Sequence, residues 1–155
     1  ALIKARFARF ATGEAIVADD SGIEAEGLGG RPGIFSARYA GEGASDKENL
    51  AKLLHEVAAA GDERRAAYVC VIALIGDDGR EFTFEGRCGG LLLIDARGAG
   101  GFGYDPAFVP DDTGPADERT MAELGSAEKN AISHRGRAAR LLAAHLGVVA
   151  GPGSR

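Results

Sequence analysis

Apolar and polar positions follow two different periods along this chain, and together they predict a mixture of helices and strands. Helical spacing places Ile3, Phe7 and Phe10 on one face of residues 1–10. The chain begins inside this pattern, with no initiator Met and no capping residue ahead of it. We therefore expect a helix that is entered partway along, in a fragment of a longer parent polypeptide.

Two further helical segments carry boundary signals of their own. Ser45 and Glu48 have the spacing of a capping box, which predicts a helix that starts there and ends near Gly61. Residues 126–146 again have a helical pattern, and Ser133 is placed to cap a second helix within it.

Short apolar runs between the helices predict strands at residues 15–18, 68–75, 81–85, 91–94 and 107–109. The turn at 77–79 joins the second and third of these runs into the clearest hairpin. Because hairpin strands are mixed with helices, we expect an α/β fold with a mixed sheet flanked by helices, rather than a doubly wound parallel sheet. One domain should span residues 1–150, and residues 151–155 should form a disordered tail.

Composition narrows the class of protein. The chain has 155 residues, of which 45% are hydrophobic and 26% charged, as in a globular domain. Its 24 glycines are about twice the usual share of ~7%. The pairs Gly29-Gly30, Gly89-Gly90 and Gly100-Gly101 predict tight turns and close approaches of the backbone to a ligand.

Charge, hydropathy and cysteine content narrow the possible partners and the cellular compartment. A net charge of −5 leaves no broad basic face for a nucleic-acid polymer, although a small anionic ligand remains compatible with it. No apolar run approaches the ~20 residues of a membrane span, and no signal peptide is visible. Cys70 lies in an apolar strand, which favours a reduced thiol in a cytoplasmic protein over a disulfide.

Asp19 and Asp20 form the first candidate site, because they follow a predicted strand at the end where α/β sheets place ligands. Neighbours in a strand point to opposite sides, so both can bind one metal ion only if the chain turns there, as Gly22 would permit. The alternative is a turn in which Asp20 or Ser21 caps a backbone amide.

Two further segments contain candidate binding residues. Phe102 and Tyr104 lie in a glycine-rich loop where an aromatic ring can stack on a nucleobase, or can instead fill the core. Residues 129–135 combine Lys, Asn, Ser, His and Arg near a helix start, which suits a keto purine or a phosphate. Their alternative is a solvated helix face.

Four stretches, at residues 18–22, 28–41, 101–106 and 128–135, together resemble the inosine-triphosphate pyrophosphatase family, also called the Ham1 family. They occur in the family's order and spacing, from near residue 1 to about residue 146. The resemblance implies an elongated mixed sheet with two lobes and a cleft between them. It also implies a cytoplasmic homodimer that hydrolyses ITP, dITP and XTP to the monophosphate and pyrophosphate with Mg²⁺.

The resemblance also implies roles for individual residues. Asp20 is similar to the family's proton acceptor, and Asp19 and Asp20 to its metal-associated carboxylates. The implied substrate contacts are Lys4 at the triphosphate, Ser21, and a base pocket of Phe102, Gly103, Tyr104, Asp105, Lys129, His134 and Arg135. The family's N-terminal strand, phosphate-binding loop and helix start do not precede Ala1. One alternative is therefore a nucleotide-binding module without turnover, and another is a structural protein whose glycine loops are only turns.

Overall fold

The computed structural model describes residues 1–148, so the expected tail at 151–155 lies outside the described residues. In chain order the elements are α1 (Leu2–Thr12), β1 (Ile16–Ala25), η1 (Glu26–Leu28), η2 (Gly33–Arg38), α2 (Asp46–Ala59), β2 (Arg65–Ile75), β3 (Glu81–Leu92), η3 (Asp105–Ala107), β4 (Phe108–Pro110), η4 (Asp111–Thr113), α3 (Ser126–Ile132) and α4 (His134–His145), where η denotes a 3-10 helix.

The four strands form one sheet in the order β1-β2-β3-β4. Its centre is the predicted hairpin, in which β2 and β3 pair from Arg65 opposite Leu91 to Ile75 opposite Glu81. All three strand pairs are antiparallel, and no parallel pair occurs among residues 1–148.

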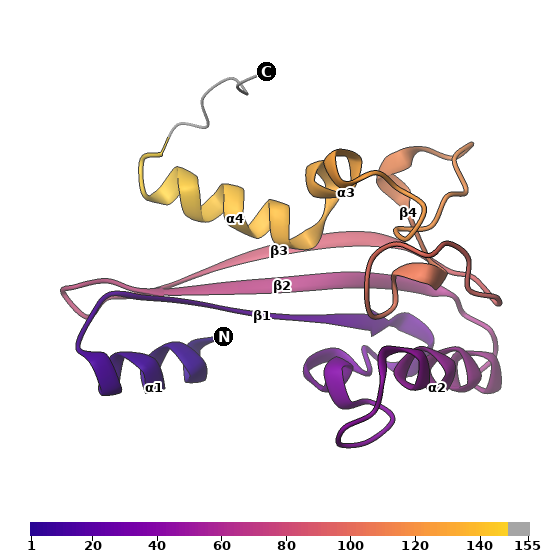
Figure 1. Ribbon diagram of the computed structural model, residues 1–155, viewed down its shortest axis with the longest axis horizontal. Helices are drawn as coiled ribbons and strands as arrows, with labels where there is room; N and C mark the ends of the chain where they lie inside the picture. Colours follow the sequence, from indigo (N-terminus) through magenta and orange to yellow (C-terminus); the bar gives the residue numbers. More distant parts are fainter. Residues whose placement is uncertain (149–155) are drawn as a thin grey trace.

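Helices cover both faces of this elongated sheet (Figure 1). Helix α4 packs on β2 and β3 from one side, while α1 packs on β1 and β2 from the other. Helix α2 lies on the same side as α1 but at the opposite end of the sheet. The expected α/β fold with helices flanking the sheet is confirmed, but the strands described within residues 1–148 pair only antiparallel rather than in the mixed pattern expected. None of the helices within residues 1–148 has the length and apolar character needed to cross a bilayer.

Local signals identify the helix boundaries correctly. The Ser45 side chain accepts a hydrogen bond from the Glu48 amide and the Glu48 carboxylate accepts one from the Ser45 amide, which is the predicted capping box. Ser133 separates α3 from α4 and accepts a hydrogen bond from the Gly136 amide. Both cysteines are buried free thiols, as expected for Cys70.

Strand β3 is longer than predicted, since it continues from the expected strand at 81–85 into the first two residues of the strand expected at 91–94. A Cβ added at Gly86 would lie 2.1 Å from the carbonyl oxygen of His134, so only glycine lets the backbone of α4 lie against the sheet there. A Cβ at Gly90 would lie 2.2 Å from the Val109 carbonyl oxygen. The prediction of a turn at Gly89-Gly90 is therefore wrong, because both residues lie within β3 and Gly90 makes room for the neighbouring backbone of β4.

Strand β1 is also longer than predicted. It continues through the Asp19-Asp20-Ser21-Gly22 segment because each residue pairs with one of β2, including Asp20 with Val71. The second half of its outer edge is covered: the Ile23 amide donates to Ser36 Oγ at 2.9 Å. Gly22 leaves no room for a side chain beside the Gly33 carbonyl oxygen, which is 2.2 Å from its virtual Cβ. Helix η2 is thereby held against β1.

Candidate functional site

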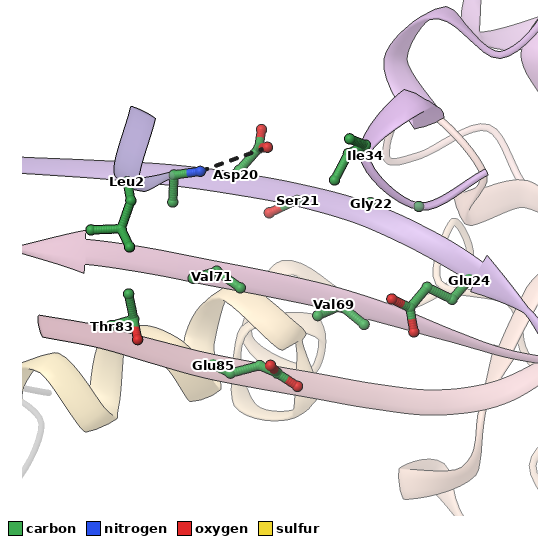
Figure 2. Close-up of a pocket in the computed structure, with 12 residues that line it drawn as sticks. Leu2, Asp20, Ser21, Gly22, Glu24, Ile34, Val69, Val71, Thr83 and Glu85 are labelled. Carbon is green, nitrogen blue, oxygen red and sulfur yellow. Dashed lines mark ion pairs between the residues drawn. The ribbon is translucent and has the colours of Figure 1, made fainter. Parts of the chain in front are cut away.

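Two cavities meet at Ser21 and Gly22 of β1, since both residues line each of them. The first, which we call the acidic cavity, has a volume of about 380 Å³ and lies between α1 and η2. Figure 2 shows Asp20, Glu24 and Glu85 along its length.

The second, which we call the aromatic cavity, has a volume of about 190 Å³. One wall carries Phe102, Tyr104, His134 and Arg135, all from the predicted base pocket. The opposite wall comes from η2 and the start of α2 and includes Asp46. Of the remaining predicted residues, Ser21 and Gly103 also line this cavity, whereas Asp105 and Lys129 lie beside it.

Asp19 and Asp20 extend to opposite faces of the sheet because β1 does not turn at Gly22. Asp20 faces the acidic cavity, where its Oδ1 lies 2.6 Å from Lys4 Nζ. Asp19 faces α4, and its Oδ2 lies 3.2 Å from Arg135 Nη2. The two carboxylates are therefore presented from opposite faces of β1 rather than side by side. The described residues contain no group of three or more His, Cys, Asp or Glu side chains arranged to hold a metal ion.

Asp105 is almost completely buried and organises the aromatic wall. Its carboxylate accepts hydrogen bonds from the Phe102 amide at 2.9 Å, the Tyr68 hydroxyl at 3.1 Å and Lys129 Nζ at 2.5 Å. The Lys129 ammonium also lies 4.8 Å from the centre of the Phe102 ring, and the Arg135 guanidinium lies 5.8 Å from it. Two hydrogen-bond donors with positive charge are thus held against one aromatic ring.

His134 is a buried member of the wall. Its ring stacks on Tyr68 with centroids 4.8 Å apart, and only 7% of the residue is exposed. Burial, assisted by the Arg135 charge, lowers the pKa of His134 to about 4. The imidazole is therefore neutral at pH 7, and its buried Nδ1 has no hydrogen-bond partner among residues 1–148.

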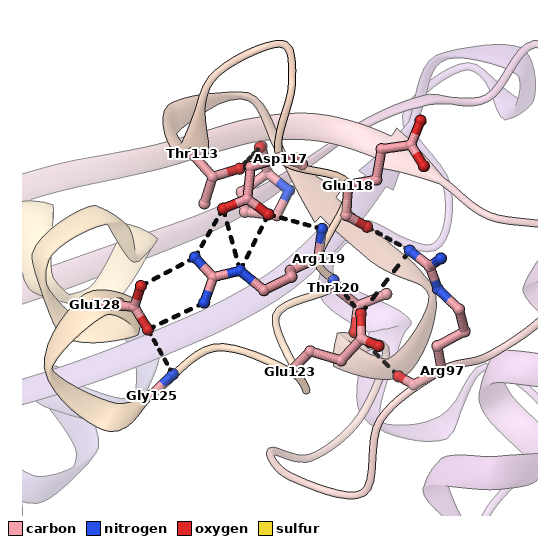
Figure 3. A network of polar contacts seen from close by, with 10 residues as sticks. Arg97, Thr113, Asp117, Glu118, Arg119, Thr120, Glu123, Gly125 and Glu128 are labelled. Atoms are coloured by element: carbon pink, nitrogen blue, oxygen red, sulfur yellow. Dashed lines mark hydrogen bonds and ion pairs between the residues drawn. The ribbon is translucent and has the colours of Figure 1, made fainter.

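A polar network fixes the approach to α3, which carries Lys129 (Figure 3). Arg119 pairs with both Asp117 and Glu128, at 2.7 Å and 3.0 Å. Glu128 in turn accepts a hydrogen bond from the Gly125 amide, and the Arg119 guanidinium lowers the pKa of Glu128. Because Lys129 follows Glu128 directly, the network holds its backbone in place.

Sequence reasoning missed Asp46, whose Oδ2 accepts a hydrogen bond from the Gly103 amide at 2.6 Å. The available signal was an acidic residue just after a helix cap, and such residues are common because they interact favourably with the helix dipole. It also missed Ser36, whose carbonyl oxygen accepts a hydrogen bond from the Tyr104 hydroxyl at 2.7 Å.

Known proteins resemble this chain in sequence. The sequence profile of the Ham1 family matches residues 1–145. A dITP/XTP pyrophosphatase of Geobacter sulfurreducens is 51% identical over 148 residues, which cover 95% of this chain and 72% of the relative. One of Mycolicibacterium paratuberculosis is 52% identical over 143 residues, covering 92% of this chain and 68% of the relative.

Solved structures give the same result. The Ham1 protein of Staphylococcus aureus superposes with a TM-score of 0.88 at 42% identity, covering 95% of this chain and 74% of that one. A HAM1 protein from Coxiella burnetii also has a TM-score of 0.88, at 43% identity, with 96% and 75% of the two chains covered.

Proposed function

Because this chain belongs to the Ham1 family, we propose that it hydrolyses the non-standard purine nucleoside triphosphates dITP, ITP and XTP to the monophosphate and pyrophosphate. Relatives named dITP/XTP pyrophosphatase support the substrate class. Such a hydrolase would remove these nucleotides from the cellular pool.

The observation that carries the proposal is the meeting of the two cavities at Ser21 and Gly22. The aromatic cavity suits a purine, and the acidic cavity beyond it contains the Lys4–Asp20 pair. A nucleotide whose base lies in the first would direct its phosphates across β1 toward the second. Ser21 lies at this crossing, where its hydroxyl can contact the substrate.

Base selection would follow from the donors on the aromatic wall. Lys129 and Arg135 both donate hydrogen bonds, and the O6 atom of hypoxanthine or xanthine is an acceptor. The 6-amino group of adenine would leave these donors unpaired, and such mismatches reduce kcat/KM by factors of roughly 10⁴–10⁵. Phe102, which is 56% exposed, would contribute stacking, worth ~1–3 kcal/mol for one base on one ring. Tyr104 is instead buried in the core, the alternative that its sequence position left open.

Asp20 would act as the proton acceptor of the hydrolysis. A water oxygen bonds to the α-phosphorus, the bond from phosphorus to the bridging oxygen of pyrophosphate breaks, and Asp20 takes the proton that the water gives up. Lys4 Nζ, 2.6 Å from Asp20 Oδ1, brings positive charge to the same position and can pair with phosphate oxygens.

We further propose that the activity depends on Mg²⁺. This ion typically takes one or two protein carboxylates, keeps several waters and binds the substrate's phosphates. Asp20, with 38% of its side chain exposed at the acidic cavity, fits such a site as its single carboxylate. Asp19 would join it only if β1 changed conformation. When bound, the ion would supply positive charge to the phosphate oxygens.

We also propose that the protein is a cytoplasmic homodimer. Exposed apolar side chains at Ile3, Phe7 and Phe10 form one stripe on α1, and a stripe of this kind suits contact with a second protein surface. The buried free thiols of Cys70 and Cys88 suit a reducing compartment.

The decisive experiment measures pyrophosphate release from ITP, dITP and XTP, with ATP and GTP as controls and Mg²⁺ present or chelated. We expect release from the first three nucleotides, and loss of that release on chelation. If nucleotides stabilise the protein against heat but no pyrophosphate is released, hydrolysis is refuted and a binding module is favoured. The absence of both pyrophosphate release and thermal stabilisation would refute the hydrolase and the binding module alike.

A further inference from the structure

Asp46 is the first residue of α2, and it connects this helix to the loop that carries Phe102. Its Oδ2 accepts a hydrogen bond from the Gly103 amide at 2.6 Å, although the two residues are 57 positions apart in the sequence. Asp46 and Gly103 both line the aromatic cavity. This contact therefore joins the two walls of the cavity.

A second hydrogen bond joins the same walls, but it differs in burial. The Tyr104 hydroxyl donates to the Ser36 carbonyl oxygen at 2.7 Å, and both residues are buried. Asp46, in contrast, is exposed. The buried contact fixes the loop after Phe102, and the exposed contact fixes it at Gly103, directly beside the ring.

The loop needs such a restraint. Gly101 and Gly103 have φ values of +77° and +59°, which glycine adopts readily but leaves just as readily. Phe102, between them, is 56% exposed, so little of its ring is held by surrounding core. The Asp105 carboxylate holds the Phe102 amide from within the loop, whereas Asp46 holds the loop from across the cavity.

We propose that Asp46 is a positioning residue, which latches the Phe102 loop across the aromatic cavity and thereby sets the affinity for the purine ring. This role rests on the proposed pyrophosphatase function, since it assigns the base to the aromatic cavity. Asp46 acts through Gly103 and Phe102 rather than on the reacting phosphate. Its loss should weaken the substrate complex and the transition state equally, which raises KM and leaves kcat unchanged.

Two substitutions separate the latch from the contribution of Asp46 to helix α2. Asp46→Ala removes both the charge that favours the helix N-terminus and the oxygen that accepts from Gly103. Asp46→Asn removes the charge but keeps an acceptor oxygen of nearly the same reach. Asp95→Ala is the matched control, because Asp95 is an exposed aspartate outside both cavities.

The test combines steady-state kinetics on ITP with hydrogen exchange of the Gly103 amide measured by NMR. We expect Asp46→Ala to raise KM about tenfold with kcat within about twofold, as loss of a hydrogen bond to a carboxylate implies. Asp46→Asn should stay within about threefold of the wild-type KM, and Asp95→Ala should match the wild type. The Gly103 amide should exchange faster in Asp46→Ala alone.

Other outcomes would overturn the latch without ambiguity. An unchanged KM in Asp46→Ala, or equal losses in the Ala and Asn variants, would show that Asp46 serves only the helix. If the wild-type chain releases no pyrophosphate, the proposed function fails. Exchange at Gly103 then decides the latch by itself, and equal rates in the wild type and Asp46→Ala would refute it.

Discussion

Mild acid should destabilise this protein through His134 before most of its carboxylates begin to titrate. The buried imidazole is stacked on Tyr68 and has a pKa of about 4, against a usual value of 6.5. Between these two values the unfolded chain binds a proton that the folded chain excludes. The free energy of unfolding is therefore highest above pH 6.5 and falls as the pH drops toward 4.

The size of the effect follows from the two pKa values. Their separation of about 2.5 corresponds to about 3 kcal/mol once the pH is below both. At pH 5 about 2 kcal/mol of this is already lost. Because His134 is only 7% exposed, little solvent screening reduces the value. A loss of 2 kcal/mol is a substantial part of the ~5–15 kcal/mol that stabilises a typical domain.

Urea unfolding at several pH values between 5 and 7.5, followed by circular dichroism, measures this loss. His134→Phe is the control, because phenylalanine keeps a flat ring against Tyr68 and cannot titrate. Subtracting its curve isolates the contribution of His134 to the pH dependence. We expect the wild type to lose about 2 kcal/mol more than the variant between pH 7.5 and 5. Parallel curves for the two proteins would refute a buried neutral His134.

Three further predictions concern the proposed chemistry and the packing. Asp20→Asn should keep the fold and calorimetric nucleotide binding but reduce pyrophosphate release about 10²–10⁴-fold, as loss of a general base implies; unchanged turnover would remove Asp20 from this role. Lys129→Ala should lower the ITP to ATP ratio of kcat/KM about tenfold or more, since one donor to O6 is lost. The exposed Lys47→Ala variant serves as its control, and an unaltered ratio would count against a place for Lys129 in the base pocket. Gly86→Ala should lower the free energy of unfolding by about 1–3 kcal/mol in urea, because its Cβ would lie 2.1 Å from the His134 carbonyl oxygen. Gly76→Ala, whose Cβ would come closest to the flexible Asp78 side chain at 3.1 Å, should cost much less, and equal losses would contradict the close contact at Gly86.

Features that depend on neighbours in the sequence could be predicted well. The capping box of Ser45 and Glu48, the helix break at Ser133 and the hairpin turn at 77–79 each depend on a few consecutive residues. The base pocket stays a prediction, which the family resemblance implies and the donors and rings of its side chains support. The structure brings most of them to one wall.

Features that depend on distant partners were missed. Gly86 and Gly90 lie within β3 because α4 and β4 approach them, and no local pattern reports that approach. The opposite directions of Asp19 and Asp20 follow from the pairing of β1 with β2. An acidic residue such as Asp46 is common in the first turn of a helix, so nothing in the sequence pointed to its contact with Gly103.

The close contact at Gly86 also limits how the site can adapt to different ligands. With backbone resting on backbone, α4 can neither approach the sheet nor move away without opening a void, so His134 and Arg135 are presented from a fixed height above β3. The Phe102 loop on the same wall, in contrast, contains glycines at positive φ and is held to the start of α2 by the exposed carboxylate of Asp46 at Gly103. Accommodation of purines of different size should therefore come from the Phe102 loop rather than from the backbone of α4. Variants selected for a new base should change the side chains on α4, and the length or the glycines of the Phe102 loop.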